Sequence, residues 1–293
     1  MPVISVRANT LPEAWEKALV AVWDDGVAVR TEYDRRDEQG NYIDPPSLDA
    51  TIVVEVADPF AEPRIHKNFP GGPEELEVYR QEVVDGVHDH WVDPTNPLTW
   101  TYTYHQRLYS YVATEDVCDP NADALSSVDQ LEYVINKAAA APHSRRMQAI
   151  TWIPNADPPT DEPPCLQRLW FRILFDESGE PVLNLNTHWR SRDGYKAWFM
   201  NVYAITDLQR KIAGQISEKM GRTVKVGRYV DICDSFHIYG ADHASLEPEI
   251  AKMKADPDYH SRAWDSSHPA IVMMTDEVRK KLADDPDFMK KSK

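Results

Sequence analysis

Cysteine is scarce in this sequence, since 293 residues contain only three, Cys118, Cys165 and Cys233. Three cysteines cannot all pair within one chain, so at least one is a free thiol, and their spacing matches no zinc or redox motif. No apolar run approaches the roughly 20 residues needed to span a bilayer, and the first ten residues lack the charged and apolar blocks of a signal peptide. We therefore expect a cytoplasmic protein that contacts no membrane.

Basic residues are also few, with 32 lysines and arginines against 48 aspartates and glutamates, which gives a formal net charge of −16 at pH 7. A surface with this excess repels polyanions, which argues against general nucleic-acid binding. A local pocket of arginines can still hold a small anion, because charges are screened beyond a Debye length of about 10 Å.

Hydrophobic and charged residues occur in ordinary amounts, 42% and 27%. This composition predicts a folded chain with a sizeable core. The sequence shows no internal repeat and no convincing linker. We expect a single domain over residues 1–293.

Hydrophobic periodicity predicts both helices and strands. Helical spacing covers residues 11–24, 74–84, 127–141, with Ser127 as N-cap, and 202–220. Strand-like runs cover residues 50–56, 147–153, 169–175, 181–187, 224–230 and 237–239, and residues 98–108 are expected to be extended. The chain beyond residue 247 is expected to be helical or mobile. This order favours an α+β fold in which helices cover one side of a mixed sheet.

Cys165 is the most suggestive single residue, because it follows a diproline at the start of a predicted strand and is therefore held in position. A cysteine is most often a small core residue, and we assign that role to Cys118 and Cys233. The surroundings of Cys165 are richer in arginine. Guanidinium groups bind phosphate oxygens in pairs, and their charge favours a thiolate over a thiol. The arginines concerned are Arg145, Arg146, Arg190 and Arg192.

Four blocks occur in a fixed order along the second half of the chain. They are Ser144-Arg145-Arg146 after a helix, Pro163-Pro164-Cys165, Arg190-Ser191-Arg192-Asp193 followed by Asn201, and His237-Ile238-Tyr239. In this order and spacing they resemble the thymidylate synthase family of pyrimidine nucleotide C5-transferases. The resemblance covers residues 127–243 well and the N-terminal third poorly. It implies a layered α+β fold that pairs two sheets face to face in a homodimer.

The resemblance also implies a role for each matching residue. Cys165 would add to C6 of a pyrimidine nucleoside monophosphate, which makes C5 nucleophilic toward the one-carbon unit of 5,10-methylenetetrahydrofolate or a related tetrahydropterin. Asp193 would contact the pterin, and Tyr102, or Tyr104 in its place, would order water near C5. The binding residues would be Arg190 and Ser191 for the phosphate, with Arg145 and Arg146 of the partner subunit, Asn201 for the base, and His237 and Tyr239 for the deoxyribose. No metal is implied.

The identity of the substrate and product depends on a few positions. The amide of Asn201 can donate and accept, which matches O4 and N3–H of uracil, whereas aspartate is typical of members that act on cytosine. This favours conversion of dUMP to dTMP. Leu166 stands where a histidine usually follows the nucleophile, and the charged C-terminus lacks an apolar closing tail, so hydroxymethylation of dUMP, dCMP or CMP is the alternative. A non-catalytic nucleotide- or RNA-binding protein is a third reading, disfavoured by Cys165 and by the net charge.

Three questions are left open by the sequence. A further phosphate contact could come from any of Arg30, Arg35 and Arg36. The glutamate that the family uses in catalysis could be any of Glu75, Glu77 and Glu82. The segment His88-Asp89-His90 resembles part of a metal site, but no third ligand has the right spacing, so we interpret it as a polar loop.

Overall fold

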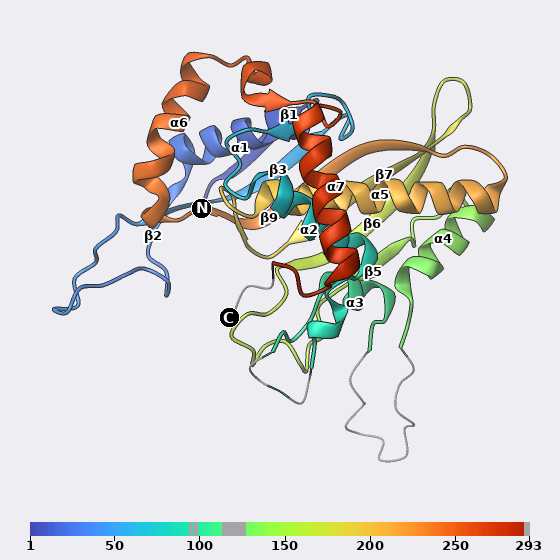
Figure 1. Cartoon of the computed structure of the whole chain (residues 1–293), viewed down its shortest axis with the longest axis horizontal. Helices are drawn as coiled ribbons and strands as arrows, with labels where there is room; N and C mark the ends of the chain where they lie inside the picture. Colours follow the sequence, from blue (N-terminus) through green and yellow to red (C-terminus); the bar gives the residue numbers. More distant parts are fainter. Residues whose placement is uncertain (94–95, 97–98, 113–126, 290–293) are drawn as a thin grey trace.

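The computed structural model describes residues 1–93, 96, 99–112 and 127–289, and its centre is an eight-stranded mixed sheet (Figure 1). The main path of the sheet runs β1-β3-β9-β7-β6-β5, with β2 paired to β3 and β8 paired to β9. Neighbours are parallel in β1–β3, β7–β9 and β8–β9, and antiparallel elsewhere. The strands are β1 (Val3–Ala8), β2 (Val27–Val29), β3 (Ser47–Val56), β5 (Gln148–Ile150), β6 (Leu166–Phe175), β7 (Pro181–Trp189), β8 (Arg192–Asp193) and β9 (Lys225–Ile238). A separate antiparallel pair joins β4 (Ile65–His66) to β10 (Ala263–Trp264).

Helices cover one face of the sheet, and the core lies between them and the strands. The helices are α1 (Leu11–Asp25), α2 (Gly72–Asp85), α3 (Tyr104–Tyr109), α4 (Gln130–Ala140), α5 (Trp198–Met220), α6 (His243–Ala255) and α7 (Pro269–Asp284), with short 3₁₀ turns at Asp89–Trp91, Gly240–Asp242 and Tyr259–Arg262. Helix α1 packs on β3, and α5 packs on β7 and β9. The apolar stripe predicted for α5 is confirmed, because Ile205, Leu208, Ile212 and Ile216 are all buried. Their burial removes apolar surface from water and holds α5 to the sheet.

The described residues cover the other face of the sheet only in part, and we call it the open face. Every second residue of a strand points away from the helices, and on β6 these include Trp170 and Arg172, which are half-buried, and Leu174, which is exposed. On β9 Val230 and Ile232 are likewise half-buried. The prediction of an α+β fold with helices on one side of a mixed sheet is therefore confirmed.

Several predicted elements differ in detail from the structure. Residues 104–108, expected to be extended, belong to helix α3, because the hydroxyl of Thr103 accepts the N–H of Gln106 and caps a helical turn. Helix α4 begins later than expected, since its N-cap is Asp129 and not Ser127. The two runs at 224–230 and 237–239 form one strand, β9, because its pairing with β3 continues between them.

Most of the described chain beyond residue 247 is helical, in α6 and α7, and strand β10 lies between these two helices. No helix in the described ranges is long and apolar enough to cross a membrane. Cys118 and the last four residues lie outside the described residues, so the packing role expected for Cys118 stays a prediction.

Candidate active site

A cavity of about 480 Å³ opens where the ends of β8 and β9 meet helices α2 and α5 and the loop before β3. Seven of the residues expected at a site from the sequence line this cavity: Cys165, Arg190, Ser191, Asp193, Asn201, His237 and Tyr239. They come from segments up to 74 positions apart, so the fold brings them together. Volumes of this order are typical of small-molecule sites.

Arg190 holds the loop that carries the candidate nucleophile. Its Nε donates to the carbonyl of Pro164 at 3.0 Å, and its Nη2 donates to that of Pro163 at 2.6 Å. Its backbone N–H donates to the carbonyl of Cys165 at 2.9 Å. Nε and Nη2 of Arg190, which were expected to bind phosphate, thus hold the two prolines in place. Nη1 of Arg190 donates no hydrogen bond to the described residues.

Arg192 is a second cation beside the nucleophile, and it also lines the cavity. Only 3% of its surface is exposed. Its Nη2 donates to Oδ2 of Asp231 at 2.7 Å, and its guanidinium carbon lies 3.5 Å above the ring of Trp189. Its Nε and Nη1 have no partner within the part of the chain that the structure describes. The sequence identified Arg192 as a source of positive charge but gave it no role of its own.

Two opposing effects set the pKa of Cys165. Burial raises the pKa of its thiol, while Arg190 and Arg192 lower it, and the net direction is upward. The two arginines therefore act in the direction that the sequence predicts, toward the thiolate, but the loss of hydration outweighs their effect on this pKa in the free protein. The sulfur nevertheless lies in the same cavity as both guanidinium groups and is not sealed in an apolar interior.

Two phenols, those of Tyr79 and Tyr104, and the amide of Asn201 line the cavity. Asn201, on α5, donates from Nδ2 to the hydroxyl of Tyr79, on α2, at 2.8 Å. The hydroxyl of Tyr104 accepts the N–H of Leu166 at 3.2 Å, next to the nucleophile. Tyr102 does not line the cavity and packs behind Tyr104, with ring centroids 5.6 Å apart. Of these two alternatives, Tyr104 therefore lies next to the candidate nucleophile.

His237, Tyr239 and Asp193 also line the cavity. The rings of His237 and Tyr239 lie 4.6 Å apart, edge to face. His237 faces the carbonyl of Ser235 through Nδ1 at 3.3 Å, and its Nε2 has no partner among the described residues. Asp193 accepts the backbone N–H groups of Tyr195 and Lys196, and burial raises the pKa of Asp193. These three residues offer an imidazole, a phenol and a carboxylate to a polar ligand.

Comparisons with known proteins identify the family. A family model described as thymidylate synthase matches residues 73–269. A protein of Methanosarcina mazei named "Putative thymidylate synthase" is 31% identical over 83% of this chain and 92% of its own length. The chain belongs to the thymidylate synthase family. A protein of Methanosarcina acetivorans with the same name is 29% identical over the same shares of the two chains.

The fold agrees with this assignment. The solved structure of thermostable thymidylate synthase A from Bacillus subtilis superposes with a TM-score of 0.55 and 17% identity, over 83% of this chain and 84% of the other. The family match starts at residue 73 and therefore extends further toward the N-terminus than the motifs that first indicated the thymidylate synthase family. It covers helix α2 from Pro73 onward, and this part of the helix contains Tyr79, which lines the cavity.

The arginines expected to complete a thymidylate synthase phosphate site lie elsewhere. Arg145 and Arg146 are exposed on the turn before β5 and do not line the cavity. Arg30, Arg35 and Arg36 do not line it either: they bond Asp34, Asp44 and the hydroxyl of Tyr42, respectively. Their loop contributes Thr31, Glu32 and Tyr33 to the cavity instead.

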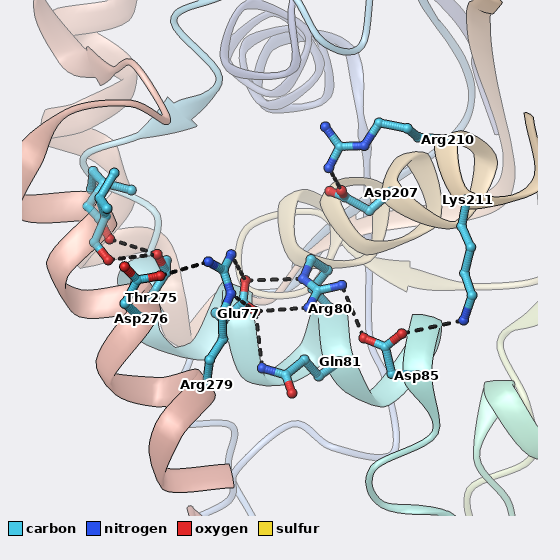
Figure 2. Close-up of polar contacts among 12 residues, drawn as sticks. Glu77, Arg80, Gln81, Asp85, Asp207, Arg210, Lys211, Thr275, Asp276 and Arg279 are labelled. Atoms are coloured by element: carbon cyan, nitrogen blue, oxygen red, sulfur yellow. Dashed lines mark hydrogen bonds and ion pairs between the residues drawn. The ribbon is translucent and has the colours of Figure 1, made fainter. Parts of the chain in front are cut away.

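None of the three candidate glutamates lines the cavity. Figure 2 shows Glu77 between the guanidinium groups of Arg80 and Arg279, whose nearest bonds to it are both 2.9 Å, so that Glu77 ties α2 to the C-terminal helix α7. Glu82 accepts a bond from His88 Nδ1 at 2.9 Å. Helix α2 presents Tyr79 to the cavity in place of a carboxylate.

The three side chains of His88-Asp89-His90 each bond a different residue. His88 bonds Glu82, Asp89 bonds His105 at 2.6 Å, and His90 bonds Asp287 at 3.0 Å. Among the described residues no group of three or more histidine, cysteine or acidic side chains is arranged to hold a metal ion.

Proposed function

We propose that this thymidylate synthase family member transfers a one-carbon unit from 5,10-methylenetetrahydrofolate, or a related tetrahydropterin, to C5 of dUMP and forms dTMP. The observation that carries the proposal is the position of Cys165, which opens into one cavity with Arg190, Arg192 and Asn201. A thiolate is a soft nucleophile suited to reversible addition at C6 of a uracil ring. Addition there moves the π electrons of the C5–C6 bond toward C5 and O4, and C5 can then attack the one-carbon unit.

The other walls of the cavity support a nucleotide in a defined orientation. Ser191 and the free Nη1 of Arg190 would bind phosphate oxygens. His237 and Tyr239 would hold the sugar hydroxyl, and Asn201 would read the base. Asp193 would contact the pterin, and we now favour Tyr104 over Tyr102 for ordering water near C5, because Tyr104 is the one that lines the cavity. We propose that residues 1–293 form one functional domain and that the enzyme acts in the cytoplasm.

Incubation of the protein with dUMP and 5,10-methylenetetrahydrofolate tests this proposal. We expect dTMP and dihydrofolate to form in equal amounts. Mass spectrometry of the nucleotide, with dUMP, dCMP and CMP compared, measures the product directly. Absence of any C5-modified nucleotide with all three substrates, while the protein is folded, would contradict the proposed function.

Hydroxymethylation is a second candidate because of Leu166. This residue is fully buried at the start of β6, so the position after the nucleophile offers no polar side chain to the cavity. Trapping of the C5 methylene by water would give a product one oxygen heavier than dTMP. The same mass spectrum therefore separates the two reactions.

We also propose that the enzyme is a homodimer in which each subunit supplies Arg145 and Arg146 to its partner's phosphate site. The turn that carries these arginines is held by the open face of the sheet. Trp170 Nε1 donates to the carbonyl of Arg145 at 3.2 Å, and Arg172 Nη1 donates to that of Ser144 at 3.1 Å. A second subunit on this face would cover the half-buried apolar residues and bring the arginines near another cavity.

Trp170→Glu is expected to give a monomer, because it places a charge on the open face, on strand β6 next to the edge strand β5. We expect kcat/KM for dUMP to fall by about 100-fold or more, since loss of two phosphate-binding arginines removes several charge-assisted hydrogen bonds. Sedimentation velocity measures the assembly state. Met273→Glu, at a site 63% exposed on α7, is the matched control and should remain dimeric and active. A fully active Trp170→Glu monomer would contradict the shared site.

A further inference from the structure

The thymidylate synthase resemblance implies a catalytic glutamate, but none of the candidates Glu75, Glu77 and Glu82 lines the cavity; the glutamate that does so among the described residues is Glu32, on the loop before β3. Glu77 and Glu82 are engaged by Arg80, Arg279 and His88, as described above. The residue of α2 that lines the cavity is Tyr79. Because α2 is fixed to α7 through Glu77 (Figure 2) and packs along α5, the position of this phenol is set by the tertiary structure.

Tyr79 and Asn201, which both line the cavity, form a hydrogen-bonded pair. The Tyr79 hydroxyl accepts from Asn201 Nδ2 at 2.8 Å, and within the described ranges it has no acceptor for its own proton. Oδ1 of Asn201 is likewise unused by these residues. The pair therefore presents one donor, the Tyr79 O–H, next to one acceptor, Oδ1.

The phenol keeps its proton under working conditions. Burial raises the pKa of Tyr79 well above its ordinary value of 10.0, and the nearby charge of Glu82 acts in the same direction. A neutral, buried hydroxyl is a preorganised donor for an oxygen on which negative charge develops. A phenol that keeps its proton can donate this hydrogen bond directly, whereas an ionised carboxylate must first gain a proton.

We propose that Tyr79 donates a hydrogen bond to O4 of the uracil ring, while Asn201 Oδ1 accepts N3–H, so that the two side chains together read the base and stabilise the adduct. This inference rests on the proposed function. When the sulfur lone pair of Cys165 forms the bond to C6, the C5–C6 π electrons move onto C5 and O4, and the Tyr79 donor faces the oxygen that gains the charge.

The same pair disfavours cytosine. Cytosine carries an amino group at C4 and an unprotonated N3, so in the arrangement that the structure shows the Tyr79 donor would face a donor and Oδ1 would face an acceptor. To bind cytosine, the Asn201 amide would have to turn over and Tyr79 would have to donate to Oδ1. Unpaired polar groups in a buried site are costly, and sites built to bond a particular group can reject analogues by large factors. Specificity for uracil would then depend on two residues and not on Asn201 alone.

Tyr79→Phe tests the proposal, since it removes one oxygen and keeps the ring. We expect kcat/KM for dUMP to fall by about 10²–10³-fold, mostly through kcat, as for loss of one oxyanion donor. Calorimetry should also show a smaller preference for dUMP over dCMP in binding affinity, because the Tyr79 hydroxyl no longer faces the C4 amino group of cytosine. A structural role alone would lower both affinities equally.

Tyr109→Phe is the matched control. Tyr109 is on α3, its hydroxyl is buried without a partner among the described residues, and it does not line the cavity. We expect its kinetics to equal those of the parent protein. Tyr79→Phe kinetics within threefold of the parent, or a fall that leaves the dUMP to dCMP ratio unchanged, would overturn the proposal while the proposed function stands. A parent protein that neither binds nor converts dUMP would overturn both.

Discussion

Cys165→Ser is expected to lower the turnover of dUMP by about 10⁴-fold or more, on the scale of losses seen when a nucleophile is removed. An alkoxide is far harder to form than a thiolate, and a hydroxyl is a poor nucleophile for conjugate addition. The side chain is only half-buried and the change is nearly isosteric, so we expect the melting temperature to stay within a few degrees. Release of tritium from C5-labelled dUMP measures the step that depends on the adduct.

Cys233→Ala is the control for Cys165→Ser. Cys233 is fully buried in β9, and burial raises the pKa of its thiol, so its sulfur is a packing group. We expect Cys233→Ala to release tritium at the parent rate and to lose about 1 kcal/mol of stability. Tritium release by Cys165→Ser at the parent rate would mean that covalent catalysis does not occur at this position.

The pH dependence of Cys165 follows from the direction of its pKa. Because burial raises this pKa above the ordinary thiol value, most of the residue is protonated at neutral pH. The thiolate is the reactive form, so alkylation of the free protein should become faster as the pH rises, up to a pH above the ordinary pKa of a thiol. The same upward trend is expected for kcat/KM, which reports the free enzyme.

Arg192→Met is expected to have the largest effect on stability. It leaves Asp231, which is fully buried, without its cation, and breaking a buried ion pair in this way typically costs about 3–5 kcal/mol. It also removes a charge that lowers the pKa of Cys165, so that this pKa should rise further and alkylation at a given pH should slow. Denaturant unfolding and iodoacetamide labelling measure the two effects separately.

The double variant Arg192→Met with Asp231→Asn separates these two roles. Without the uncompensated carboxylate, we expect much of the lost stability to return. The alkylation of Cys165 should remain slow, because no cation replaces Arg192 at the sulfur. A double variant in which stability and alkylation recover together would show that Arg192 acts on Cys165 only by maintaining the fold.

Much of the site could be predicted because its residues lie in short blocks whose order carries information. Cys165 after its diproline, the segment from Arg190 to Asp193, Asn201 and His237 were all identified from the sequence, and all line one cavity. The main helices and strands were also predictable, since periodicity is a local signal. The family assignment confirms the resemblance that these blocks suggested.

The features that escaped prediction depend on contacts between distant segments. Glu77 is held by Arg279, 202 positions later, and no local pattern indicates this pairing. Tyr79 could not be predicted from the sequence, because only the packing of α2 on α5 shows that a phenol faces the cavity. The upward pKa shift of Cys165 was missed for the same reason, because desolvation depends on burial and cannot be read from neighbouring arginines.

The central claim is that Cys165 forms a covalent bond with the pyrimidine ring. It is tested most directly by incubating the protein with 5-fluoro-dUMP and 5,10-methylenetetrahydrofolate, because the fluorine at C5 cannot leave as a proton does and the adduct is trapped. Peptide mass spectrometry should find the mass of nucleotide and folate on the peptide that contains Cys165 and on no other. A folded protein that gains no mass, or gains it at Cys118 or Cys233, would contradict the account.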